Sequence, residues 1–227
     1  MKTFQDFIQE GVNDPGIFKA FYTAGGPGSG KSYVARESGA GKTSPYGLKV
    51  IDSDPLFSKM LKDAGMATTP KDIYSDEGQS MRDRAKSLIS KQEDTYMEGR
   101  LGLLIDGTGK DYNKIKRSSD KLRGIGYDTY MIFVNTSLDV ALQRNEARRR
   151  SLDEDEVKKM WDAVQKNMGK FQTYFGRESF LLVDNNSAGE DIFTKVFVEI
   201  GKLIDKKPTN RAATAWIKNQ HAINRRG

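Results

Sequence analysis

Five short apolar runs recur along the chain, and stretches with helical spacing of apolar residues lie between them. A short apolar run bounded by turn residues is typical of a buried strand. Strands that alternate with helices predict a parallel sheet with helices on both faces. The pattern therefore predicts an α/β fold with a five-stranded, mostly parallel sheet, whose strands lie at residues 17–23, 48–52, 101–106, 129–134 and 180–184.

The two ends of the chain differ from this central part. Residues 1–16 are interpreted as a short leader, in which apolar residues have the spacing of one helical turn before the turn residues at 13–16. Residues 206–227 contain six basic residues and no acid, whereas the rest of the chain carries 31 basic and 31 acidic residues. We therefore predict one domain at residues 17–205. The basic tail either contacts a polyanion such as nucleic acid or is a solvated end of the chain.

Composition excludes several kinds of chemistry. The chain has no cysteine, so it has no disulfide, thiolate nucleophile or cysteine-ligated zinc. No apolar run reaches the roughly 20 residues of a membrane helix, and the N-terminus lacks the apolar core of a signal peptide. We therefore expect a cytoplasmic protein without a membrane segment. His221 is the only histidine and has no partner in sequence for metal binding or acid–base chemistry.

A glycine-rich motif follows the first predicted strand. Residues 25–32 read Gly-Gly-Pro-Gly-Ser-Gly-Lys-Ser, which matches the P-loop pattern G-x-x-x-x-G-K-[ST]. The glycines let backbone N–H groups face phosphates, and the following helix N-terminus adds positive potential. Lys31 is expected to reach the β- and γ-phosphates, and the Ser32 hydroxyl to ligate Mg²⁺. The predicted nucleotide-binding residues are Gly25, Gly26, Pro27, Gly28, Ser29, Gly30, Lys31, Ser32 and Tyr33.

Acidic residues follow the second and third predicted strands. Because open α/β sheets bind ligands at the carboxyl ends of their strands, these acids are expected beside the P-loop. Asp54 is our candidate for the base that receives the proton of an acceptor hydroxyl, and Asp52 for a role at Mg²⁺. Either residue could instead cap the helix that begins at Asp54-Pro55.

The third strand ends in Leu-Leu-Ile-Asp-Gly-Thr-Gly at residues 103–109. A run of apolar residues followed by an acid resembles a Walker B strand, so Asp106 is a candidate to orient Mg²⁺. The two glycines leave room for a ligand against the backbone, although an ordinary glycine turn has the same pattern. The predicted substrate-binding residues are Asp52, Asp106, Thr108 and Lys110, and the predicted metal ligands are Ser32 and Asp106.

A helix predicted at residues 139–150 leads into four arginines. Guanidinium groups stabilise the charge on a transferring phosphoryl group through paired hydrogen bonds. Arg144 and Arg150 are therefore predicted to be catalytic, together with Lys31 and Asp54. The alternative is a solvated charged face that is balanced by the acids at 153–156.

Another helix is predicted to follow Ser151. Ser151 and Glu154 have the spacing of a capping box, in which the serine side chain accepts a backbone N–H bond. Apolar residues between 157 and 168 then follow helical spacing. We interpret this stripe as part of the core rather than as a ligand platform.

Four of these motifs together resemble the zeta-toxin-like P-loop kinases. They are the P-loop at 26–32, Val-Ile-Asp-Ser-Asp at 50–54, Ile-Asp-Gly-Thr-Gly-Lys at 105–110 and the later arginines. The resemblance covers residues 17–205 and implies a P-loop NTPase fold with ATP and Mg²⁺ as ligands. It also implies that Asp54 is the catalytic base and that Arg144 and Arg150 belong to a lid.

The activity that the resemblance implies is transfer of the ATP γ-phosphate to a hydroxyl of a small molecule such as a nucleotide sugar. The chain differs from the family at Asp106, where glutamate is usual, and at Lys110, where arginine is common. Polynucleotide 5′-kinases have a similar P-loop, base and lid, so a nucleic-acid end is a second candidate acceptor. A non-catalytic ATP-binding module, docked by the leader and tail, is the third interpretation.

Overall fold

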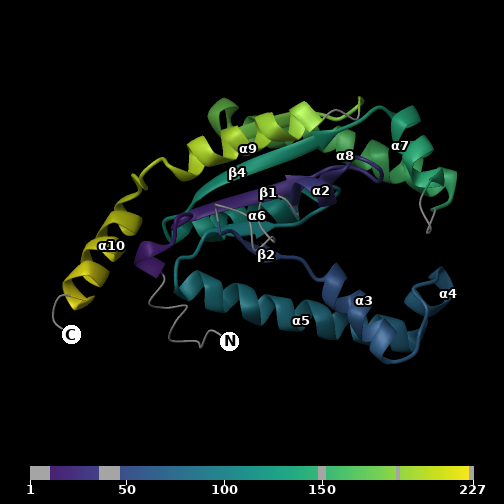
Figure 1. Ribbon diagram of the computed structural model, residues 1–227, viewed down its shortest axis with the longest axis horizontal. Helices are drawn as coiled ribbons and strands as arrows, with labels where there is room; N and C mark the ends of the chain where they lie inside the picture. Colours follow the sequence, from purple (N-terminus) through teal and green to yellow (C-terminus); the bar gives the residue numbers. More distant parts are fainter. Residues whose placement is uncertain (1–10, 36–46, 148–151, 188–189, 225–227) are drawn as a thin grey trace.

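The computed structural model describes residues 11–35, 47–147, 152–187 and 190–224. Its centre is a five-stranded sheet in the order β2-β3-β1-β4-β5, in which every neighbouring pair is parallel (Figure 1). Each of the five predicted strands is present within a few residues of its expected position. The strands are β1 Lys19–Ala24, β2 Lys49–Ile51, β3 Leu103–Ile105, β4 Asp128–Asn135 and β5 Phe180–Asp184.

The strands β1 and β4 are buried because helices cover both faces of the sheet. Every residue of β1 is buried, and in β4 only the two end residues are partly accessible. Such continuous apolar strands are typical of parallel sheets. The register pairs Tyr22 with Ile105 and Ile105 with Ile51, so β1, β3 and β2 end side by side. The residues that follow these three strands therefore meet at one edge of the sheet.

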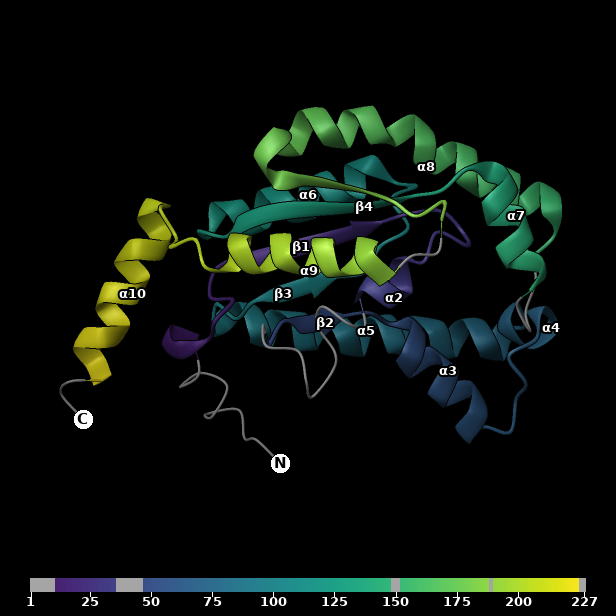
Figure 2. The same ribbon diagram turned by 45° about the horizontal axis from the view of Figure 1, so that its top comes forward.

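The helices divide between the two faces (Figure 2). One face is covered by α5 (Asp76–Glu98), α6 (Tyr112–Gly124) and α8 (Glu154–Phe175), and α10 (Arg211–Asn224) joins the same core from the end of the sheet. The other face is covered by α2 (Lys31–Ala35) and α9 (Glu190–Ile204). The helix α7 (Leu138–Glu146) follows β4. Among the described residues, no helix combines the length and the apolar character needed to cross a membrane.

Two short helices form a satellite beside the carboxyl edge of the sheet. The helices α3 (Asp54–Asp63) and α4 (Pro70–Ile73) pack on α5, away from the strands (Figure 1). Phe57, Leu61 and Ala85 form the small separate core between them. Because α5 runs from this satellite to the sheet, its middle part forms a wall beside the strand ends.

Part of the predicted basic tail forms the packed helix α10. Ala213 is completely buried, and the Trp216 ring meets the Phe18 ring edge-on with 5.5 Å between centroids. Phe18 directly precedes β1, so α10 lies at the amino end of the sheet. The P-loop and α2 lie at the opposite end (Figures 1 and 2).

The start of α8 differs from the sequence-based prediction. The helix begins at Glu154 and its N-cap is Asp153, whose side chain accepts the backbone N–H of Asp155 at 3.0 Å. Capping by Ser151 is therefore wrong, since the acid nearest to the first turn takes this position and also suits the helix dipole. Ser151 itself lies outside the described residues. Val157 and Val164 are buried, as the predicted core stripe requires.

Candidate functional site

The loop between β1 and α2 is a tight turn that only glycine can form at two positions. A Cβ at Gly25 would lie 2.5 Å from Ser29 Oγ, and a Cβ at Gly28 would lie 2.8 Å from the Ala141 carbonyl oxygen. Gly28 also has a φ of +75°. A side chain at either position would force the loop to shift. Backbone N–H groups can converge on a phosphate here because the glycines place no Cβ in the turn.

We expect Gly28→Ala to weaken ATP binding at least about tenfold, because the strain and the contact with α7 displace the loop. Isothermal titration with ATP and Mg²⁺ measures this effect. Gly169→Ala in α8 is the matched control, since a Cβ there meets nothing within 4 Å. The control is expected to bind ATP normally and to be more stable by about 0.5–1 kcal/mol. Equal ATP affinities of the two variants would contradict the prediction.

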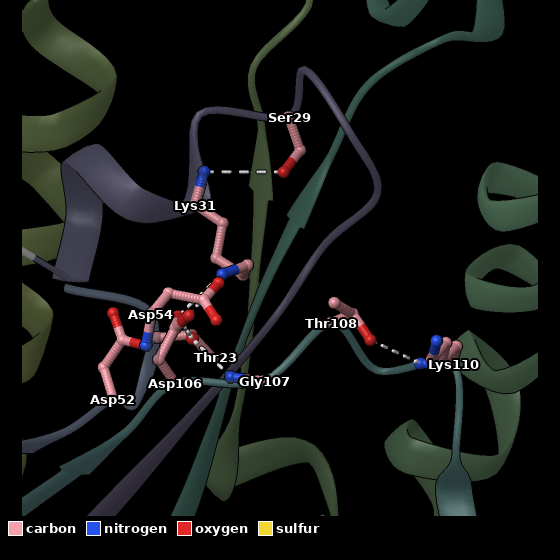
Figure 3. A network of polar contacts seen from close by, with 9 residues as sticks. All are labelled: Thr23, Ser29, Lys31, Asp52, Asp54, Asp106, Gly107, Thr108 and Lys110. Atoms are coloured by element: carbon pink, nitrogen blue, oxygen red, sulfur yellow. Dashed lines mark hydrogen bonds and ion pairs between the residues drawn. The ribbon is translucent and has the colours of Figure 1, made fainter. Parts of the chain in front are cut away.

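Lys31, Asp106 and Thr23 form a compact polar network where β1 and β3 end (Figure 3). Lys31 Nζ lies 2.7 Å from both carboxylate oxygens of Asp106, and Thr23 Oγ1 donates to Asp106 Oδ1 at 2.6 Å. The side chains of Lys31 and Asp106 are only 12% and 14% exposed. Charge-assisted hydrogen bonds are strong when partly shielded from water. This network therefore holds the Lys31 ammonium group next to the Asp106 carboxylate.

Asp52 and Asp54 lie beside this network (Figure 3). Asp54 is the first residue of α3, and its backbone N–H donates to Asp52 Oδ1 at 2.9 Å. Neither acid is the N-cap of α3: that residue is Ser53, which makes no side-chain capping bond, and Asp52 supports the start of the helix from the position before it. Burial raises the pKa of the Asp52 carboxyl, the Asp54 N–H bond lowers it, and the negative charges of Asp106 and Asp54 raise it further. The Asp54 side chain is exposed.

A cavity of about 470 Å³ opens beside these carboxylates, within the usual range for small-molecule sites. Its walls are α5 and α6, and Tyr22, Ile105 and Ile115 contribute apolar surface. The cavity brings together the predicted phosphate-binding lysine, both acids after β2 and all of the predicted substrate-binding residues. The site residues predicted from the sequence that line this cavity are Lys31, Asp52, Asp54, Asp106, Thr108 and Lys110.

The loop after β3 is anchored from two sides. Asn167 of α8 is 7% exposed, and its Nδ2 donates to the carbonyl oxygens of Gly109 at 3.1 Å and Lys110 at 2.9 Å. The backbone N–H of Gly25 donates to the Thr108 carbonyl oxygen at 3.1 Å, which joins this loop to the P-loop. The side chains of Thr108 and Lys110 are exposed. Both therefore extend from a fixed backbone.

Arg144 connects α7 to the P-loop. Its Nη1 donates to the Gly28 carbonyl oxygen at 3.2 Å. Arg150 lies outside the described residues, so its catalytic role stays a prediction. Asn145 binds both backbone groups of Leu152, donating to the carbonyl at 2.8 Å and accepting the N–H at 3.0 Å. These two hydrogen bonds hold Asn145 and Leu152 together, one before and one after the arginines at 148–150.

Ser32 and Tyr33, which complete the predicted nucleotide-binding set, are exposed in the first turn of α2. The described residues contain no group of three or more His, Asp or Glu side chains that could hold a metal ion. Mg²⁺ is commonly bound by one or two protein oxygens together with substrate phosphates. Ser32 and Asp106 fit that pattern, and Asp52 is a further carboxylate in the lining of the cavity.

Three buried polar residues that brace the site were missed by sequence reasoning: Thr23, Asn167 and Asn185. Asn185 follows β5, is 3% exposed, and donates from Nδ2 to the Ser29 carbonyl oxygen of the P-loop at 2.7 Å. A polar residue inside or directly after an apolar segment is the signal that could have indicated them, because a buried polar group needs a partner. The sequence pattern does not show, however, which residue is the hydrogen-bond partner.

Burial raises the pKa of the Glu93 carboxyl in the α5 wall; Lys121 and Lys114 lower it, and Asp94 adds to the rise. The folded state therefore binds this proton more tightly than the unfolded chain. The resulting stabilisation is present below the ordinary pKa of about 4.5 and is lost as the pH rises through the higher native value. We expect Glu93→Gln to raise the melting temperature by about 2 °C at pH 7, with the difference disappearing near pH 4.

Thermal melting from pH 4 to 8 measures this effect. Glu98→Gln is the control, since that residue is exposed on the same helix. A Glu93→Gln variant less stable than the wild type at pH 7 would show that the ionised carboxylate is stabilising.

The parallel sheet with a P-loop after its central strand β1 defines a P-loop NTPase-like kinase fold, which implies ATP binding. Residues 21–170 match the family model described as an AAA domain. The match covers more than half of the chain, and the chain belongs to this family. No curated protein matches the sequence.

Solved structures share this fold at low sequence identity. A candidate kinase from Chloroflexus aurantiacus J-10-fl is 14% identical, with a TM-score of 0.56 over 81% of this chain and 97% of its own. A gluconokinase from Sinorhizobium meliloti 1021 is 16% identical, with a TM-score of 0.50 over 83% and 95%. The AvrRxo1-ORF1:-ORF2 structure with ATP is 16% identical, with a TM-score of 0.53 over 91% and 72%. At these identities the similarity shows the fold alone.

Proposed function

We propose that this protein is an ATP-dependent kinase that transfers the γ-phosphate to a hydroxyl of a small molecule such as a nucleotide sugar. The observation that carries the proposal is that Asp54 and the phosphate-binding Lys31 line one cavity at the carboxyl edge of the sheet. A protein that only binds a nucleotide does not need a carboxylate facing space for a second molecule. The similarity in fold to a gluconokinase supports a small-molecule acceptor.

The P-loop residues fit the phosphates of ATP. The glycine cradle leaves space that a Cβ would fill, and Lys31 and Arg144 bring positive charge to it. Ser32 and Asp106 would hold Mg²⁺. When bound, ATP with Mg²⁺ supplies the γ-phosphoryl group and part of the charge neutralisation.

The chain itself would handle the proton and the developing charge. Asp54 would accept the proton of the acceptor hydroxyl as the new oxygen–phosphorus bond forms and the bond to the β-phosphate oxygen breaks. Lys31 would stabilise the negative phosphoryl oxygens, because a preorganised cation needs no reorganisation during the reaction. Asp52 is a positioning residue, since its bond to the Asp54 N–H fixes the start of α3.

The position of α10 favours a small acceptor over a nucleic-acid end. The basic helix packs on Phe18 at the amino end of the sheet and does not line the cavity. A polyanion held by α10 would lie away from Asp54. Contact between the 206–227 tail and a polyanion is therefore a separate proposal from the identity of the acceptor.

Transfer of label from γ-labelled ATP tests the proposal. The acceptor panel contains UDP-sugars, sugar acids, nucleosides and 5′-hydroxyl DNA and RNA. We expect label to move to one small-molecule class in the presence of Mg²⁺. Label on the nucleic-acid ends alone would favour a polynucleotide kinase. ATP binding without transfer to any acceptor would favour the non-catalytic module.

A further inference from the structure

The cavity beside Asp54 carries positive charge that the phosphoryl-transfer residues do not use. Lys110 precedes α6, and Lys114 lies in its first turn; both line the cavity. Among the residues that the structure describes, neither amino group has a hydrogen-bond or ion-pair partner. Lys86, on the α5 wall, is instead paired with Asp83 at 3.3 Å. Lys114 also interacts electrostatically with Glu93 of α5, which lines the same cavity, so the two lysines face a ligand without a direct bond but not without a nearby acid.

Both lysines extend from backbone that is held in place. Asn167 binds the Lys110 carbonyl oxygen at 2.9 Å, and the Asp111 side chain accepts the Lys114 backbone N–H at 2.9 Å as the N-cap of α6. The backbone conformation between Lys110 and Lys114 is therefore fixed at both ends. Two flexible amino groups on such a base can converge on one oxyanion while the backbone stays fixed.

The lysine side of the cavity is separate from the catalytic side. Figure 3 shows Asp52, Asp54 and Asp106 gathered around Lys31, with Lys110 well apart from them beyond Thr108. The cavity surface also includes apolar side chains, among them Tyr22 and Ile115. A ligand that reaches from one side to the other contacts carboxylates at one end, apolar surface, and ammonium groups at the other end.

We propose that the acceptor is a small organic anion whose hydroxyl lies at Asp54 and whose phosphate or carboxylate group is bound by Lys110 and Lys114. The inference rests on the proposed kinase function and narrows its substrate class. Neutral sugars and nucleosides offer no oxyanion to these lysines, and Lys114 then has the Glu93 carboxylate as its electrostatic partner in the cavity. An oxyanion group forms charge-assisted hydrogen bonds with both, and truncating the lysines removes these bonds.

A binding experiment tests the anion site without requiring phosphoryl transfer. The protein is first saturated with AMP-PNP and Mg²⁺ so that the P-loop is occupied, and inorganic phosphate is then titrated while the melting temperature is followed. We expect phosphate to stabilise the wild type, and the double variant Lys110→Met/Lys114→Met to bind it at least about tenfold more weakly. The control Lys158→Met/Lys202→Met removes the same charge from exposed pairs on α8 and α9. Equal phosphate responses in the two double variants would overturn the proposal.

Matched acceptors then identify the oxyanion group. The transfer assay compares glucose with gluconate and glucose 6-phosphate, and uridine with its monophosphate and a UDP-sugar. We expect only anionic members to accept label, and the lysine variant to raise their KM at least about tenfold with little change in kcat. Equal transfer to neutral members would overturn the proposal. Phosphate binding that depends on the two lysines, with no transfer to any acceptor, would instead retain the anion site and contradict the kinase function.

Discussion

Replacing Asp54 with asparagine is expected to lower kcat about 10²- to 10⁴-fold, the range for loss of a general base. The carboxylate is exposed to the cavity, and its own backbone N–H is already satisfied by Asp52. Asparagine keeps the size of the side chain but cannot take a proton. Steady-state transfer from γ-labelled ATP measures kcat, and titration calorimetry measures ATP affinity, which we expect to stay unchanged.

Asp63→Asn is the matched control for Asp54→Asn. Asp63 is an exposed acid at the other end of α3, so its replacement changes the same charge on the same helix. We expect this variant to retain full turnover. If Asp54→Asn also kept near-normal turnover, Asp54 would have no part in the proton transfer and Asp52 would become the candidate.

Lys31→Met is expected to reduce kcat at least about 10²- to 10³-fold, the loss typical for a preorganised charge at the reacting group. It is also expected to lower stability, because Asp106 is 14% exposed and, within the described part of the chain, keeps the Thr23 hydroxyl as its one side-chain partner. Removing one member of a buried ion pair costs about 3–5 kcal/mol. Transfer kinetics and denaturant unfolding measure the two effects separately.

The double variant Lys31→Met/Asp106→Asn separates the two effects of Lys31. Asparagine removes the unpaired charge, so we expect most of the lost stability to return, while activity stays low because the variant lacks both Lys31 and the proposed Mg²⁺ ligand Asp106. Recovery of activity together with stability would show that Lys31 acts only through folding. Normal transfer in the correctly folded Lys31→Met variant would contradict its role at the phosphates.

Local sequence patterns were sufficient to predict the strands and the phosphate loop. The runs at 17–23 and 129–134 became β1 and β4 because a continuous apolar run can be buried on both faces only inside a covered sheet. The motif at 25–32 required Gly25 and Gly28, whose close contacts with Ser29 and Ala141 leave no space for a side chain. The strands and the phosphate loop could be predicted because they depend on residues close in sequence, or on the general requirement that helices cover both faces of a parallel sheet.

Contacts between distant parts of the chain could not be predicted in this way. The sequence placed Asp106 near the P-loop, but its direct pairing with Lys31 followed from the register of β1 and β3. Asn167 and Asn185 support the site from α8 and from the end of β5, where the sequence shows only polar residues without partners. Packing decided these partners because each contact joins residues that only the folded sheet brings together.

By itself, the sequence determined the α/β class, the P-loop and the acids after β2 and β3, because strand periodicity and glycine geometry are local properties. The tertiary structure decided which helices form the walls of the cavity. The α5 residue Glu93 and the α6 residue Lys114 face one space only because α5 and α6 pack on the same face of the sheet. It also decided that α10 packs against Phe18, since the burial of Ala213 and the partial burial of Trp216 require an apolar surface from the other end of the chain.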